Sequence, residues 1–297
     1  MAHTRTTTSL RRTLRREVPG TVGLLVDARD FAAMRRYRTF PFDDHTTYLQ
    51  ETERLLRTLA AGGTHTTVTL FDPEDYAAYC AETGLDPDSR AGRSRYTAEI
   101  AVARTRVPYA GQPIEELVPL LVGTAVRHAT REYATLLLAD AGHCADCGQD
   151  IGHAAFDQAT RAVLRILEGA GPGTHHLVCS VPAADDHLLA VLHTDRTGPD
   201  RSRLDSTEGS EFVTVLAAGL ARSAPGGIVL RTSSPGAPDR LHGWRLDHGR
   251  LVPLTEAEVF NAYCTDADTG EPLPPESGVE YRAGFDLAPD DGRPTHH

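Results

Sequence analysis

Short apolar runs alternate with longer segments of helical periodicity in the first half of the chain, and this alternation is the strongest constraint on the fold. The runs TVGLLVDA at 21–28 and THTTVTLFD at 64–72 are typical of strands. A helix is predicted over 45–63, ending in two glycines, and another over 73–84, beginning with proline and ending with glycine. Because strands joined by helices usually pair in parallel, residues 20–141 are predicted to form an α/β domain with a mainly parallel, Rossmann-like sheet.

The second half of the chain has a different order of elements. Two neighbouring apolar runs, at 175–182 and 187–195, are separated by a short turn and predict a β-hairpin. Thr255 and Glu258 have the spacing of a capping box, which predicts the start of a helix. Residues 154–286 are therefore predicted to form an α+β domain.

Three further segments flank or connect these halves. Residues 1–19 form a basic arm that we expect to be flexible, and residues 287–297 form a tail that we expect to be disordered. Residues 142–153 contain two cysteines and two histidines and are predicted to link the two halves.

The composition excludes several classes of function. No lysine occurs among the 30 basic residues, which excludes Schiff-base lysine chemistry and the lysine-dependent phosphate loops and kinases. The net charge of −11 argues against a general nucleic-acid or anionic-membrane binder. Neither a secretory signal nor an apolar stretch of roughly 18 residues is found, so we expect a cytoplasmic protein without a membrane span, with its five cysteines reduced.

The segment GHCADCGQDIGH carries the most compact chemical signal. Cys144 and Cys147, followed by Gly148, form a C-x-x-C-G pattern in which two thiolates can bind one tetrahedral ion. Locally it resembles the zinc knuckle of ribbon and treble-clef proteins, although a second C-x-x-C is missing. We predict a structural zinc, with His143 and His153 as the nearest further ligands and, as alternatives from the next strand, His175, His176 and Cys179. A redox dithiol and a turn without metal remain as alternatives.

Two aspartates follow the first two predicted strands. Asp27 and Asp72 would lie at the same edge of a parallel sheet, where ligands commonly bind. They could then hold Mg²⁺ in a metal-dependent phosphodiesterase or nuclease. Asp72 also precedes Pro73 directly, which is the pattern of a helix N-cap.

Arginines gather after the first strand and suggest a ligand. Arg29, Arg35 and Arg36 carry guanidinium groups suited to bidentate phosphate recognition, and a second group, Arg90, Arg93 and Arg95, precedes a later helix. The leading hypothesis is a protein that binds a phosphate-bearing ligand, a nucleotide or RNA segment, at the N-terminal sheet. Surface arginines paired with carboxylates are the simpler interpretation. A protein-interaction module without a small-molecule site, its partner unknown, is a further alternative.

Overall fold

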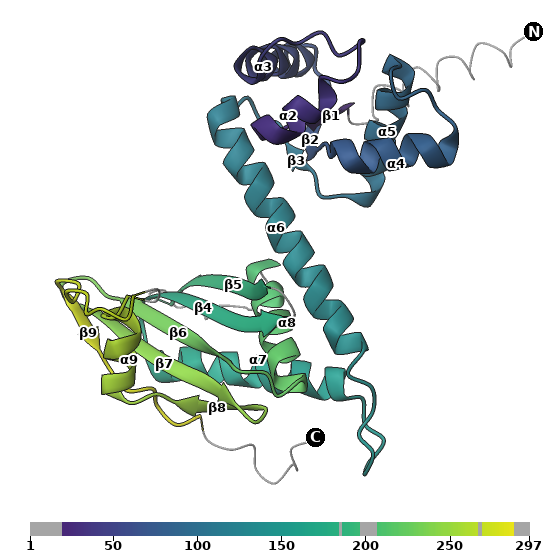
Figure 1. The fold of residues 1–297 in the computed structure, drawn as a ribbon. Helices are drawn as coiled ribbons and strands as arrows, with labels where there is room; N and C mark the ends of the chain where they lie inside the picture. The colour runs from purple at the N-terminus through teal and green to yellow at the C-terminus, as the bar shows by residue number, and fades with distance from the viewer. Residues whose placement is uncertain (1–19, 184–185, 197–206, 267–268, 288–297) are drawn as a thin grey trace, which may run out of the picture. The chain divides into compact units, whose positions relative to one another are not determined.

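The computed structural model describes residues 20–183, 186–196, 207–266 and 269–287. It divides into two compact units, Met1–His128 and Ala129–His297, which we call the N-terminal and C-terminal units and describe separately (Figure 1). Helix α6 (Ile114–Ala139) carries the chain from one unit into the other. The basic arm at 1–19 and the tail from 288 onward lie outside the described residues.

The N-terminal unit contains a three-stranded sheet in the order β1-β2-β3. Its strands are β1 (Gly20–Leu24), β2 (Thr66–Leu70) and β3 (Val107–Pro108). Its helices before α6 are α2 (Ala28–Met34), α3 (His45–Ala61), α4 (Pro73–Thr83) and α5 (Arg90–Ala103).

The prediction of a mainly parallel, Rossmann-like sheet is wrong. Strands β1 and β2 are parallel, but β3 pairs with β2 in the antiparallel direction and over only two residues. Two helices, α4 and α5, lie between β2 and β3, so the chain returns to the end of the sheet at which β2 finishes, and β3 then runs in the opposite direction. Pro108 also lacks the N–H that a longer ladder would require.

The two faces of this sheet differ in chemistry. Leu24 and Val68 are fully buried in an apolar core with Leu56 of α3. Thr21 and Thr67 form a cross-strand pair on the other face, where their Oγ1 atoms lie 3.0 Å apart. This hydroxyl-bearing face packs against α5.

The C-terminal unit contains a six-stranded sheet, which is mostly antiparallel. The order is β5-β4-β6-β7-β8, and β9 pairs in parallel with β7. The predicted hairpin is confirmed, because β4 and β5 pair along their whole length. The strands are β4 (Thr174–Ala183), β5 (Asp186–Asp195), β6 (Gly226–Ser233), β7 (Asp239–Asp247), β8 (Arg250–Pro253) and β9 (Val279–Tyr281).

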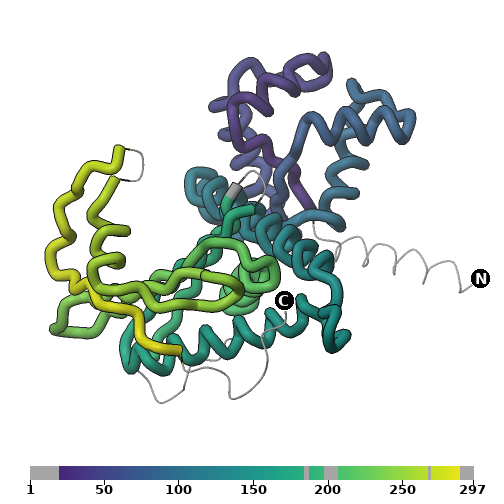
Figure 2. The backbone as a smooth tube through the Cα atoms, turned by 60° about the horizontal axis from the view of Figure 1, so that its bottom comes forward, coloured from purple at the N-terminus to yellow at the C-terminus, as the bar shows by residue number. Residues whose placement is uncertain are grey.

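Helices cover one face of this sheet and part of the other. Helices α7 (Ile151–Ala170) and α8 (Thr207–Ala221) pack on one face and form the core with Leu177, Leu230 and Trp244 (Figure 1). Helix α9 (Glu256–Tyr263) begins with the predicted capping box. The last described segment runs back along β7 and β8 (Figure 2), where the carbonyl of Phe285 accepts a hydrogen bond from Trp244 Nε1 at 2.9 Å.

None of the helices in the described part of the chain combines the length and apolar character that a membrane span requires.

Candidate functional site

The strand-end aspartates lie at the same edge of the N-terminal sheet, since β1 and β2 are parallel. Asp27 caps α2, where its side chain accepts a hydrogen bond from the N–H of Asp30 at 2.7 Å. Asp72 caps α4 by accepting from the N–H groups of Glu74 at 2.8 Å and Asp75 at 3.2 Å. Partial burial, with the charges of Asp27 and Asp72 nearby, raises the pKa of Asp30. The carboxylates are thus close enough to interact, and both predicted metal ligands serve as helix caps.

The three arginines predicted to bind phosphate are all exposed on or just after α2. Arg29 lies 3.8 Å from the carboxylate of Glu74, and Arg35 is the C-cap residue of α2. The guanidinium carbon of Arg36 lies 4.9 Å from the centre of the Tyr37 ring. The role of these arginines in phosphate binding stays a prediction.

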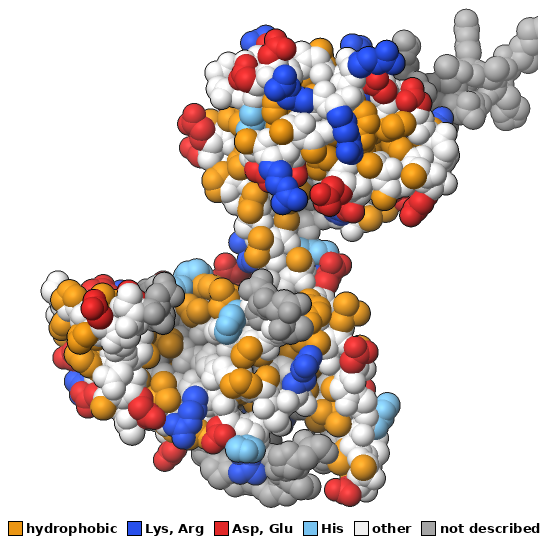
Figure 3. Space-filling view, viewed as in Figure 1, with side chains coloured by type: hydrophobic (Ala, Val, Ile, Leu, Met, Phe, Trp, Pro, Cys, Tyr) orange, Lys and Arg blue, Asp and Glu red, His pale blue; other side chains and the backbone are white. Residues whose placement is uncertain are grey.

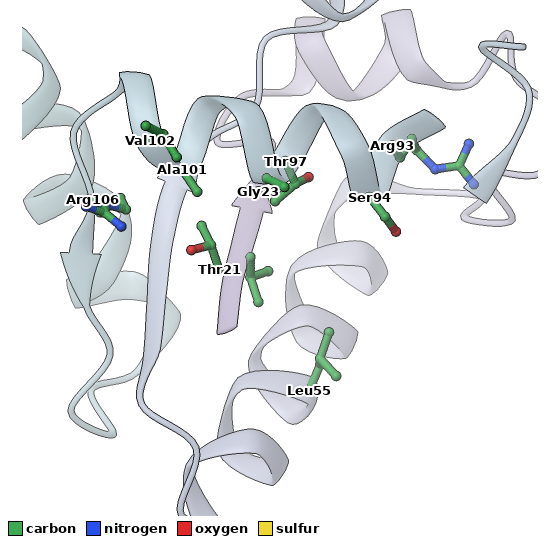
Figure 4. A pocket seen from close by; sticks show the side chains of 11 residues that line it. Thr21, Gly23, Leu55, Arg93, Ser94, Thr97, Ala101, Val102 and Arg106 are labelled. Carbon is green, nitrogen blue, oxygen red and sulfur yellow. The ribbon is translucent and has the colours of Figure 1, made fainter. Parts of the chain in front are cut away.

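A hollow of about 520 Å³ opens beside β1, on the sheet face covered by α5 (Figure 4). It lies entirely within the N-terminal unit. Its lining combines small, hydroxyl-bearing, apolar and cationic side chains and contains neither aspartate nor glutamate: Thr21, Val22, Gly23, Leu55, Arg93, Ser94, Thr97, Ala98, Ala101, Val102 and Arg106.

Gly23 allows α5 to approach the sheet closely. A Cβ atom at this position would lie 2.9 Å from Cδ2 of Phe71 and 3.3 Å from Oγ1 of Thr97. The first distance is too short for two carbon atoms, so a larger residue would displace the helix or the phenyl ring. The close approach brings Thr97 of α5 and Thr21 of β1 to the same hollow.

The two arginines of the hollow differ in how they are held. Arg93 donates hydrogen bonds to Oγ1 and to the carbonyl oxygen of Thr39, both at 3.0 Å, so its guanidinium is fixed. Arg106 is exposed and forms no hydrogen bond or ion pair with any other described residue. The hydroxyl groups of Ser94 and Thr97 likewise have no hydrogen-bond partner among the described residues. The hollow therefore presents one available guanidinium and two available hydroxyls.

The cysteine segment forms a tight hairpin between α6 and α7. The N–H of Gly148 donates to the carbonyl of Cys144 at 2.8 Å, and Gly148 has a left-handed φ of 70°. Cys144 is buried, whereas Cys147 is exposed.

The predicted histidine ligands do not complete this site. His143 forms an isolated antiparallel bridge with Asp150, and His153 lies in the first turn of α7 with its imidazole 3.9 Å from Asp157. Across the described residues, no three His, Cys, Asp or Glu side chains are gathered as a metal ion requires. The zinc therefore stays a prediction.

Two further candidates for zinc ligands have structural roles in the C-terminal unit. His175 is buried, and its ring nitrogens lie 3.0 Å from Oγ1 of Thr232 and 3.1 Å from the carbonyl oxygen of Gly171. Cys179 is fully buried in the core, where burial raises the pKa of its thiol to about 12.

Sequence reasoning missed most residues of the hollow. Arg106 precedes a two-residue strand and has no motif around it, and Ser94 and Thr97 lie in an ordinary helix pattern. The available signal was the run of threonines in the second strand, which marks a sheet face rich in hydroxyls rather than in Val and Ile.

A family model described as a domain of unknown function (DUF8829) matches residues 9–112. The matched range contains β1 to β3 and α2 to α5, and with them every residue that lines the hollow. No curated protein and no solved structure matches the chain.

Proposed function

We propose that the N-terminal unit binds a phosphate-bearing small molecule in the hollow between β1 and α5. The observation that carries this proposal is the lining itself, which holds two guanidinium groups and three hydroxyl-bearing side chains without a single carboxylate. In a chain with a net charge of −11, a cavity with only cationic and neutral side chains favours an anion.

The chemistry of these groups matches a phosphate. Arg106 can donate two parallel hydrogen bonds to phosphate oxygens, and the hydroxyls of Ser94 and Thr97 are additional donors. The apolar walls formed by Leu55 and Val102, whose side chains are exposed, can contact an uncharged part of the same ligand. A nucleotide combines both features, an anionic group and a flat, weakly polar base.

The hollow differs from the site around Arg29, Arg35 and Arg36, none of which lines it. It also does not contain Asp27 or Asp72, the residues of the phosphodiesterase alternative. We therefore propose a binding function rather than an enzymatic one. If no ligand binds, a protein-interaction module without a small-molecule site replaces this proposal.

The test compares Arg106, which lines the hollow, with an arginine of α5 that does not. Binding of inorganic phosphate and of a nucleotide panel to the full chain is measured by calorimetry at low and high salt. Arg106→Ala should weaken binding by about tenfold or more, because a charge-assisted hydrogen bond contributes roughly 1.5 to 3 kcal/mol. Arg95→Ala, on the exposed side of α5 and outside the lining, is the matched control and should bind as the wild type does.

A second variant keeps the shape of the hollow. Thr97→Val removes one hydroxyl at almost constant volume, and a several-fold loss of affinity is expected from the loss of a hydrogen bond. Failure of the wild type to bind phosphate or any nucleotide, or equal binding by Arg106→Ala, would refute the proposed function.

A further inference from the structure

The two outer strands of the C-terminal sheet are protected to different degrees. At one edge, β8 has only four residues, carries Arg250 and ends in Pro253, and such short strands with charge and proline resist pairing with another chain. At the other edge, β5 has ten residues and neighbours only β4 (Figure 1). Its central stretch, HLLAVLH at 187–193, contains no charged residue, proline or glycine. Strand β5 therefore lacks the features that keep an edge strand from pairing.

The hydrogen bonds around β5 show which residues point to its open side. Arg196, directly after β5, donates its N–H to the carbonyl of Gly173 at 2.9 Å, so even-numbered residues bond toward β4. Odd-numbered residues point outward, as the N–H of His193 does in donating to Oε2 of Glu208 at 3.2 Å. His193 and His176 are accordingly a non-hydrogen-bonded pair, in which side chains approach closely, and their imidazole centres lie 4.6 Å apart.

Leu189 and Val191 combine an open backbone with exposed apolar side chains. Their N–H and C=O groups point away from β4 and have no hydrogen-bond partner in the described part of the chain. Their side chains, 55% and 36% exposed, lie on the sheet face away from α7 and α8, where Val178 and Val229 continue the apolar row across β4 and β6. Hydrophobic and histidine side chains are visible over the sheet of this unit in Figure 3. The edge thus offers both hydrogen bonds and apolar contact to an added strand.

The sequence of this edge is almost symmetric about Ala190. When a second β5 pairs in the antiparallel direction with Ala190 on the two-fold axis, Leu189 faces Val191 of the second copy, and histidine faces histidine at both ends of the stretch. The odd-numbered residues then form the hydrogen-bonded pairs, which matches the outward direction of their N–H and C=O groups. No like charges are placed opposite each other, although each copy has a net charge of −11.

We propose that the chain forms a two-fold symmetric homodimer in which β5 pairs with β5 of a second copy, centred on Ala190. A second copy is favoured over another protein because the edge is complementary to itself in hydrogen bonding and in apolar contact. The N–H of His193 is already used by Glu208 and the paired stretch is short, so the interface is small and the dimer is reversible rather than obligate. The interface belongs to the C-terminal unit and the hollow to the N-terminal unit, so this inference is independent of the proposed function.

Sedimentation equilibrium of the full chain, kept reduced, is the first test. The wild type should convert from monomer to dimer as its concentration rises. Leu189→Lys should weaken the dimer by about tenfold or more, because it places a charge at the centre of the edge in both copies. Leu164→Lys, at a 42% exposed position of α7, is the matched control and should dimerise as the wild type does. Circular dichroism verifies that each variant is folded.

Disulfide formation tests the register, in chains that carry Cys147→Ser to remove the exposed thiol. A mixture of Leu189→Cys and Val191→Cys proteins should form a covalent heterodimer on mild oxidation, because Cα atoms of a hydrogen-bonded antiparallel pair lie about 5.5 Å apart. Either variant alone should form little covalent dimer, since its two cysteines are then displaced by two residues along the strands, beyond the limit of about 7 Å for a disulfide.

Three results would overturn the proposed dimer. The first is a wild type that stays monomeric at every concentration, which would leave the edge of β5 to another partner. The second is a dimer that Leu189→Lys leaves unchanged. The third is equal disulfide formation in the mixture and in each cysteine variant alone.

Discussion

Replacing Asp72 by asparagine or by alanine separates helix capping from metal chemistry. The side chain of Asp72 accepts hydrogen bonds from two N–H groups in the first turn of α4, those of Glu74 and Asp75. Asparagine retains an acceptor oxygen at the same place and caps helices about as well as aspartate, whereas alanine has none. The two substitutions remove the same negative charge, so they differ mainly in the cap.

The expected magnitudes follow from these contacts. Asp72→Ala should cost about 1 kcal/mol of local stability, within a usual range of roughly 0.5 to 2 kcal/mol. Asp72→Asn loses the attraction of a carboxylate to the helix N-terminus, worth about 0.3 to 1 kcal/mol at an exposed site. Both substitutions also relieve the repulsion that contributes to the raised pKa of Asp30. Because only alanine also loses the capping oxygen, the net cost of Asp72→Asn should be clearly smaller than that of Asp72→Ala.

Hydrogen exchange of the α4 amides, measured by mass spectrometry at neutral pH, is the appropriate assay. The only tryptophan, Trp244, lies in the C-terminal unit, so its fluorescence does not report on α4. A loss of 1 kcal/mol should speed local exchange about fivefold in Asp72→Ala. Glu82→Ala, exposed near the other end of α4, is the control and should change little.

Equal exchange rates of the α4 amides in Asp72→Ala and Glu82→Ala would refute the capping argument. Exchange as fast in Asp72→Asn as in Asp72→Ala would refute it too. The asparagine variant also tests the enzyme alternative. A Mg²⁺-dependent phosphodiesterase activity that disappears in Asp72→Asn, with α4 still protected, would assign Asp72 to metal binding instead.

The thiol groups provide two more predictions. If zinc binds at the cysteine pair, elemental analysis should detect one equivalent of zinc in the wild type and none in Cys147→Ser. The variant should also be less stable than the wild type, because metal binding is coupled to folding. A wild-type protein that is fully stable without metal would contradict this prediction. With chelator present at pH 8.5, iodoacetamide should alkylate the exposed Cys147 while Cys179, with its pKa raised to about 12, reacts only after unfolding. Mass spectrometry of the labelled peptides measures both rates, and early labelling of Cys179 would show that its burial is incomplete.

Local features were predictable from the sequence because neighbouring residues determine them. Pro73 at the first position of α4, Gly84 with its left-handed φ of 66° at the C-terminus, and the capping box of Thr255 and Glu258 all occur as expected. Each depends on contacts within one turn of helix. The hairpin of β4 and β5 was predictable for the same reason, since its strands are adjacent along the chain.

Strand direction and the site depend on contacts that no local pattern encodes. The direction of β3 follows from the two helices α4 and α5, which together return the chain to the end of the sheet at which β2 finishes. Arg106 lines the hollow only because that return brings the start of β3 to β2, whose other neighbour, β1, also lines the hollow and is far away in sequence. His176 and His193 become a pair through the register of the hairpin, which a shift of a single residue would have abolished.

The composition of the N-terminal sheet supports the location of the proposed ligand site. The face that packs on α3 has Leu24 and Val68, as an apolar core requires, whereas the face toward α5 has Thr21, Gly23 and Thr69. Valine would bury more apolar surface at the threonine positions and glycine contributes none, so this face is not optimised for hydrophobic stability. Thr21 bonds to its cross-strand neighbour and Thr69 donates to a carbonyl at 3.0 Å, so these hydroxyls are satisfied within the protein. On this side of the sheet the strand hydroxyls are already hydrogen-bonded, whereas donors without a partner line the hollow. Such a surface can bind a hydrated anion without burying an unpaired polar group.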